Sequence, residues 1–150
     1  MGGDYHGLVV HFINVTIKQP RFGRAIGWHR DYPNTAYCTA QSDFLRLMLC
    51  LDGMAADSGA TRFLPASHGI SDAQAASDKD HGTWPRPAAD DGICLACAPG
   101  QLVAIHPKVL HGGGMNTSER PRRNIVIQVG KASAALTTDD RDLLTGMLLG

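Results

Sequence analysis

Short apolar segments, each bounded by Gly, Pro or polar residues, run along most of the chain. The first, Leu8–Ile17, is rich in Val, Ile and Phe, which suit a pleated strand. Phe44–Leu51 is a nearly continuous apolar run, as expected of a strand buried on both faces. Three shorter strands are predicted at Thr61–Leu64, Leu102–His106 and Asn124–Val129. Several short strands joined by turns predict a mainly β domain, either a sandwich or a barrel.

Two segments depart from this pattern. Ser71–Asp91 is rich in Ala, Asp, Ser and Pro. A polar connection of this length in a small domain is usually a functional loop or disordered. Thr138–Leu149 begins with acidic residues and continues with Leu and Met residues that form one apolar face, which predicts a C-terminal helix that covers a sheet.

Length and charge exclude several classes of protein. The 150 residues suffice for one domain with a core, and we expect a single domain over residues 1–150. The 14 basic and 14 acidic side chains cancel and no basic stripe is present, so we expect no nucleic-acid partner. No apolar run approaches the roughly 20 residues that cross a bilayer, and the N-terminus lacks a signal-peptide stretch. We therefore expect a soluble, cytoplasmic protein without a membrane partner.

The cysteines do not predict a metal site. Cys94 and Cys97 form one Cys-x-x-Cys pair, without a second pair or a histidine at zinc-site spacing. With Cys38 and Cys50, they are interpreted as reduced thiols that pack in the interior.

The candidate chemistry begins at His29 and Asp31. On a strand, residues i and i+2 point to the same side, so an imidazole and a carboxylate can converge on one metal ion. The pair is a weak signal by itself and needs a second histidine. His111, in a Gly-rich segment, is the best source, and His106 is the weaker candidate because Pro107 follows it. Two histidines and one carboxylate leave open positions for a co-substrate and oxygen, as in non-haem Fe(II) oxygenases.

Three arginines, Arg120, Arg122 and Arg123, follow His111 and precede an apolar strand. A hairpin returning from His111 would bring one of them near the metal. The planar fork of its guanidinium would grip the far carboxylate of a dicarboxylate co-substrate such as 2-oxoglutarate. The alternative, that the arginines are simply solvated charges, fits at least two of the three.

Four motifs make the chain resemble the phytanoyl-CoA dioxygenase family, to which ectoine hydroxylase is related. In order, they are His29-x-Asp31, the segment Gly59–His68 that ends in Pro-Ala-Ser-His, Gly100-Gln101, and His111-Gly112 with Asn116 and Arg122. The resemblance spans roughly Trp28–Val129. It implies a double-stranded β-helix (a cupin-like jelly roll). It also implies Fe(II) held by His29, Asp31 and His111, with 2-oxoglutarate paired to Arg122 and consumed with oxygen to give succinate and carbon dioxide.

The resemblance also points to residues after the first motif. Thr39, Gln41 and Arg46 lie where relatives contact 2-oxoglutarate or substrate. Arg46 interrupts an apolar strand, and a buried cation costs several kcal/mol unless it is paired. It either lies at the mouth of the barrel with its head in water or contacts an anion inside. His68 is expected to hold its turn or to orient a ligand.

The resulting hypothesis is an oxygenase that hydroxylates a small organic substrate or performs a related oxidation. Asp31 favours this over halogenation, because halogenases of this iron class lack the carboxylate so that chloride occupies its place. The chain reaches His29 after only 28 residues, a shorter N-terminal region than relatives commonly have. We therefore expect a second copy to cover an exposed sheet face in a homodimer.

Two alternatives stay open. One is a non-catalytic jelly-roll module that binds a metal or a small ligand. The other is a cupin-type enzyme that uses a different metal and no 2-oxoglutarate. The sequence contains no signature of the substrate.

Overall fold

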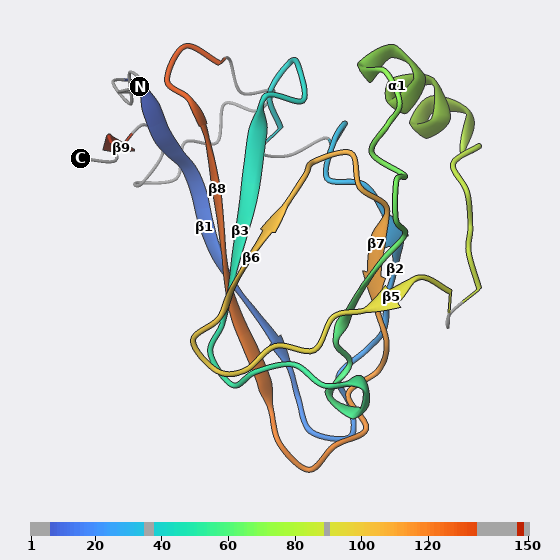
Figure 1. Ribbon diagram of the computed structural model, residues 1–150, viewed down its shortest axis with the longest axis vertical. Coiled ribbons are helices and arrows are strands. Elements are labelled where there is room, and N and C mark those ends of the chain that lie inside the picture. The colour runs from blue at the N-terminus through green and yellow to red at the C-terminus, as the bar shows by residue number, and fades with distance from the viewer. Residues whose placement is uncertain (1–6, 35–37, 89–90, 135–146, 149–150) are drawn as a thin grey trace.

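Two antiparallel sheets face each other in the computed structural model, which describes residues 7–34, 38–88, 91–134 and 147–148 (Figure 1). The five-stranded sheet has the order β6-β3-β8-β1-β9, and the four-stranded sheet has the order β2-β7-β4-β5. The strands are β1 (Leu8–Lys18), β2 (Ile26–His29), β3 (Phe44–Cys50), β4 (Thr61–Phe63), β5 (Ile93–Cys94), β6 (Leu102–Ile105), β7 (His111–Gly113), β8 (Arg122–Lys131) and β9 (Met147–Leu148). A 3-10 helix, η1 (Ala56–Ser58), and an α-helix, α1 (Asp72–His81), complete the elements. The predicted mainly β, jelly-roll architecture is confirmed.

The five strands predicted from the sequence are present as β1, β3, β4, β6 and β8, with ends displaced by at most two residues. The short strands β2, β5 and β7 are additional. β7 consists of His-Gly-Gly, which has little intrinsic preference for a strand. It forms because β2 and β4 pair with it on either side.

The prediction of an irregular connection over Ser71–Asp91 is wrong for residues 72–81, which form α1. Ser71 caps the helix by accepting a hydrogen bond from the Gln74 N–H at 3.0 Å, and Gly82 ends it in a left-handed conformation. Most of the helical C-terminal segment predicted at Thr138–Leu149 lies outside the described residues. Its two described residues form β9, which pairs with Val9 and Val10 of β1, so the helix prediction is wrong at these positions.

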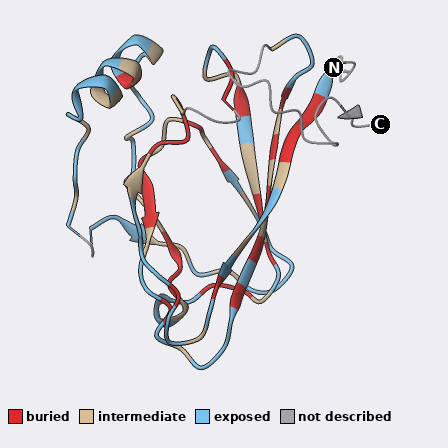
Figure 2. Ribbon diagram, turned by 180° about the vertical axis from the view of Figure 1, so that it is seen from behind, coloured by how far each residue is buried: buried red, intermediate tan, exposed pale blue. Residues whose placement is uncertain are grey.

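Buried residues lie where the two sheets face each other, whereas α1 is largely exposed (Figure 2). One core cluster contains Met48, Cys50, Met54, Ala60, Ile105 and Val126. All four cysteines are free thiols. Burial, together with a hydrogen bond involving Cys97, raises the pKa of Cys50 to about 11. Cys50 is therefore protonated at neutral pH and packs as a small apolar side chain, as the sequence predicts.

The outer face of the five-stranded sheet is apolar. Cross-strand registration places aliphatic side chains in two rows, Ile13–Ile127–Leu47–Ala104 and Val15–Ile125–Leu49–Leu102. Val15 and Leu102 are more than half exposed. No described element covers these rows, since α1 lies beyond the other sheet (Figure 1). Among the described residues, no helix is long and apolar enough to cross a membrane.

Candidate active site

His29, Asp31 and His111 converge at one point between the two sheets. His29 ends β2 and His111 begins β7, and the two are direct partners in the antiparallel pairing. The Nε2 atom of His29 lies 4.0 Å from Asp31 Oδ1, and that of His111 lies 3.7 Å from Asp31 Oδ2. One ligand atom from each residue lies within 4.8 Å of the others. The sequence prediction that His111, not His106, completes the set agrees with this geometry.

The hydrogen bonds of these residues leave metal-binding atoms free. His29 Nδ1 lies 2.8 Å from the Gly27 carbonyl and His111 Nδ1 lies 3.0 Å from the Val109 carbonyl, so each Nδ1–H donates and each Nε2 keeps its lone pair. Burial lowers the pKa of His111, although Asp31 opposes the shift, so its imidazole is neutral at pH 7. Asp31 Oδ2 is buried without a hydrogen-bond partner. Two imidazole lone pairs and an unsatisfied carboxylate oxygen facing one another fit a divalent transition metal.

Arg30 and the Pro65–His68 turn hold the ligand segments in place. Arg30 donates to the carbonyls of Ser67 and Lys108, which joins the segment between His29 and Asp31 to the segment before His111. The Ser67 hydroxyl accepts from the Leu110 N–H at 2.8 Å. Ser67 therefore joins the Pro65–His68 turn to the segment that precedes His111. His68 is exposed beside the His106 ring, at a centroid distance of 5.1 Å.

The metal-binding residues line a cavity of about 130 Å³ between the sheets. Lys18 and Arg122 also line it, as cross-strand partners on β1 and β8. Both are buried, and neither forms an ion pair with a carboxylate in the described part of the chain. Arg122 instead contacts the Met54 sulfur at 3.3 Å, and its Nε has no hydrogen-bond partner. Because buried cations are normally paired, this region of the cavity is suited to an anionic ligand group.

Sequence reasoning missed Lys18. Its signal was the polar series Asn14, Thr16 and Lys18, which occupies alternate positions of an otherwise apolar strand and lines the cavity. Burial, followed by repulsion from Arg122, lowers the pKa of Lys18 to about 8. Its ammonium group donates a hydrogen bond to the Gly114 carbonyl.

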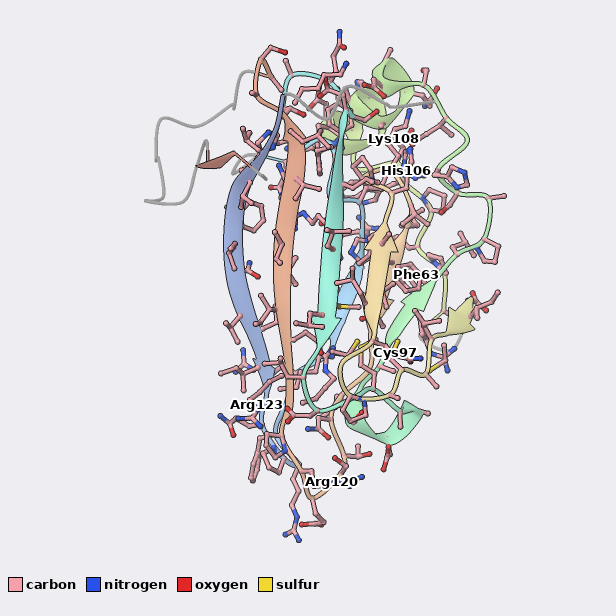
Figure 3. All side chains as sticks on the ribbon, turned by 60° about the vertical axis from the view of Figure 1, so that its left-hand side comes forward. Phe63, Cys97, His106, Lys108, Arg120 and Arg123 are labelled. Atoms are coloured by element: carbon pink, nitrogen blue, oxygen red, sulfur yellow. The ribbon has the colours of Figure 1, made fainter. Side chains whose placement is uncertain are left out.

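The other predicted residues separate into two groups. Arg46 lies inside the barrel, where its Nη1 pairs with Asp31 Oδ1 at 2.9 Å, so the anion-contact alternative applies. Thr39 and Gln41 line a separate hollow with Asp43 and Lys131, so their role as co-substrate contacts gains no support from the geometry. β7 and β8 lie in different sheets, so the predicted hairpin after His111 is instead a connection between the sheets, and Arg120 and Arg123 are exposed at its far end (Figure 3). Arg122 is the one of the three arginines that enters the cavity.

A jelly roll with a two-histidine, one-carboxylate site and a cationic pocket defines the class of non-haem iron oxygenases. The chain matches the model of the family described as Phytanoyl-CoA dioxygenase (PhyH) over residues 6–124. The chain therefore belongs to this family, as the motifs predict.

Three relatives illustrate the similarity. A probable alpha-ketoglutarate-dependent hypophosphite dioxygenase of Stutzerimonas stutzeri is 28% identical over 148 residues, covering 85% of this chain and 50% of its own. The structure of AviO1 from Streptomyces viridochromogenes Tue57 is 26% identical, with a TM-score of 0.65, covering 85% of this chain and 53% of its own. The structure of EctD from S. alaskensis with bound Fe shares the fold at 17% identity and a TM-score of 0.63, covering 93% and 51%.

The chain spans about half the length of each of these relatives. The family is described as one of dioxygenases, which are oxidoreductases. Together with the geometry of His29, Asp31 and His111, membership of this family supports Fe(II) and 2-oxoglutarate as its cofactors.

Replacing Asp31 with Ala should abolish metal binding, because it removes the buried carboxylate whose two oxygens face the two imidazoles. Anaerobic calorimetric titration with Fe(II) or Co(II) should show that the affinity for the metal falls by more than about 100-fold. Loss of a residue that only orients a metal ligand typically lowers metal affinity by about 10- to 100-fold. The matched control is Asp57→Ala, which removes an exposed carboxylate outside the cavity. Equal affinity in Asp31→Ala and the unmodified protein would contradict the ligand assignment.

Proposed function

We propose that residues 1–150 form a single Fe(II)- and 2-oxoglutarate-dependent dioxygenase domain that hydroxylates a small molecule and releases succinate and carbon dioxide. The observation that carries this proposal is the presence, in one cavity, of a convergent metal-binding set and two buried cations that pair with no carboxylate among the described residues. The name of the Stutzerimonas stutzeri relative supports it.

Each end of the cavity has a separate role in the proposal. His29, Asp31 and His111 would hold Fe(II), which with 2-oxoglutarate and oxygen supplies the oxidising chemistry. Arg122 and Lys18 would bind the distal carboxylate of 2-oxoglutarate, where an arginine fork and an ammonium group compensate a charge taken out of water. The apolar lining from Met48, Ile105 and Val126 would exclude water from the reacting centre.

The cavity favours a small substrate. Its volume of about 130 Å³ would be shared with 2-oxoglutarate. Hypophosphite, for which the Stutzerimonas stutzeri relative is named, is a small anion and is therefore the first compound to assay, followed by small organic acids. The carboxylate of Asp31 favours oxygenation over halogenation, because it occupies the position that a halide would need.

We also propose that the apolar outer face of the five-stranded sheet is the contact surface of a homodimer. The face consists of the two aliphatic rows described above. Its nearest formal charge, Arg123, pairs with Asp52 at 2.7 Å at one end. A nearly neutral aliphatic surface is complementary to a second copy of itself, and two such sheets pack face to face about 10 Å apart.

The cytoplasmic location predicted from the sequence stays a prediction.

The activity is tested by measuring succinate release with added Fe(II), 2-oxoglutarate and each candidate substrate. Substrate-stimulated succinate formation is expected. Arg122→Met should raise the KM for 2-oxoglutarate roughly 10- to 100-fold, the effect of losing a charged hydrogen bond. Arg123→Met, on the opposite face of the same strand, is the control. A metal-binding module would bind without turnover, and a cupin-type enzyme would not depend on 2-oxoglutarate.

Lys18 should make 2-oxoglutarate binding depend on pH. Its pKa of about 8 means that it is mainly protonated below pH 8 and loses its charge above it. Because only the protonated form attracts a carboxylate, the Kd should rise by roughly tenfold between pH 7 and pH 9. Calorimetry at several pH values, with Co(II) in place of Fe(II), measures how the Kd for 2-oxoglutarate depends on pH. Lys18→Met should remove this dependence. If the Kd of Lys18→Met still rises with pH, the pH dependence belongs to another group.

The dimer is tested by light scattering coupled to size exclusion and by sedimentation. The unmodified chain is expected at twice its 16.0 kDa mass. Val15→Glu, which puts a charge into one of the two aliphatic rows of the apolar face, should shift it to a monomer. Phe22→Glu, at an exposed aromatic in a turn, is the matched control. A well-folded monomer at all concentrations would refute this surface as a dimer contact.

A further inference from the structure

Three inward-facing side chains form a cross-strand row beside the metal-binding residues. Phe12 of β1 is registered with Gln128 of β8, which is registered with Arg46 of β3. Arg46 Nε donates a hydrogen bond to Gln128 Oε1 at 3.3 Å, and the guanidinium lies over the Phe12 ring, 5.0 Å from its centroid. Gln128 is fully buried. The Arg46 side chain is therefore held on two sides before it reaches Asp31.

A β-bulge extends this row by one further residue. The pairing of β1 with β8 shifts between Val10 and Phe12, which leaves His11 as the extra residue of the bulge. His11 is buried and accepts a hydrogen bond at Nδ1 from Gln128 Nε2 at 3.1 Å. A Cβ atom at Gly130 would lie 2.6 Å from His11 Cε1, so the glycine leaves the space that the imidazole occupies.

Two side-chain hydrogen bonds link Arg46 through Gln128 to His11. With His11 Nδ1 accepting, His11 Nε2 carries the proton and donates to the Lys131 carbonyl at 3.3 Å. Gln128 then donates from its amide nitrogen and accepts from Arg46 at its oxygen. Arg46 has only donors, so it donates both to Gln128 and to Asp31, and the Gln128 amide is oriented because its oxygen must accept from Arg46.

Arg46 acts on only one of the two Asp31 oxygens. Its Nη1 lies 2.9 Å from Oδ1, whereas Oδ2 has no hydrogen-bond partner and faces His111 Nε2. We propose that His11, Gln128 and Arg46 form a positioning relay that holds Oδ1 and thereby presents Oδ2 of Asp31 to the metal. The relay favours one-oxygen coordination, which preserves the open positions that a co-substrate and oxygen need.

The contacts favour positioning of Asp31 over direct recognition of a ligand. Arg46 already uses Nε for Gln128 and Nη1 for Asp31, and the attraction to the Phe12 face fixes the plane of the guanidinium. Arg122, by contrast, has an Nε without a partner in the same cavity. The two arginines therefore have different roles. Arg122 faces the co-substrate, and Arg46 faces the carboxylate of Asp31.

The inference rests on the metal site proposed above, so the experiment first measures the Kd for Co(II) in the unmodified protein and in Asp31→Ala. Arg46→Met should then weaken Co(II) binding 10- to 100-fold, the range found for residues that orient a ligand. It should also change the visible absorption spectrum of bound Co(II). Gln128→Leu should have a smaller effect of the same sign. The double variant should bind no more weakly than Arg46→Met, because Gln128 acts through Arg46.

Arg123→Met is the matched control, because it breaks an Arg–Asp pair of similar length on the outer face of the neighbouring strand. It should leave the Kd and the spectrum unchanged. Arg46→Lys, which retains the charge but cannot bind Gln128 and Asp31 together, should restore part of the affinity.

Unchanged Co(II) binding in Arg46→Met, with a higher KM for 2-oxoglutarate, would overturn the relay and make Arg46 a co-substrate contact. If Arg46→Met does not fold, Gln128→Leu decides, because it removes no charge, and an unchanged Kd would overturn the proposal. Absence of Co(II) binding in the unmodified protein would instead overturn the metal site itself.

Discussion

The carboxylate of Asp31 is the constraint around which the interior is arranged. It is buried, and one of its oxygens receives no hydrogen bond from any described residue, which costs free energy in a protein interior. The neighbouring groups reduce this cost without satisfying that oxygen. Arg46 neutralises the charge from one side, and the imidazoles of His29 and His111 face it from the other. The polar set is stable enough to be buried and still has capacity for a cation.

The jelly roll makes this arrangement possible because it brings distant segments together between two sheets. His29 and His111 are far apart in the sequence but are direct partners in one antiparallel pair. Arg30 and Ser67 then connect the segments that flank them, so the positions of the ligands depend on backbone carbonyls and not on exposed side chains. Mutual constraint of this kind gives a metal site a defined geometry before the metal binds.

Charge divides the same cavity into two regions. Near the metal-binding set, Arg46 is compensated by Asp31. Further along β1 and β8, Lys18 and Arg122 lie next to each other, and no carboxylate in the described part of the protein pairs with either. Their proximity contributes to the lowered pKa of Lys18. A dicarboxylate that spans the two regions would bind the metal at one end and neutralise Lys18 and Arg122 at the other. The whole cavity, more than the metal-binding set alone, therefore supports the proposed co-substrate.

The sequence by itself determined the main strands, because alternating apolar positions report local burial. It also indicated His29, Asp31, His111 and Arg122 through the order and spacing of short motifs. Tertiary structure decided everything that depends on cross-strand registration: Lys18 opposite Arg122, the relay from His11 to Arg46, and the absence of Thr39 and Gln41 from the cavity. Helix α1 was missed because its capping residues lie in a segment whose overall composition resembles a loop. Registration joins residues far apart along the chain, and no local pattern records it.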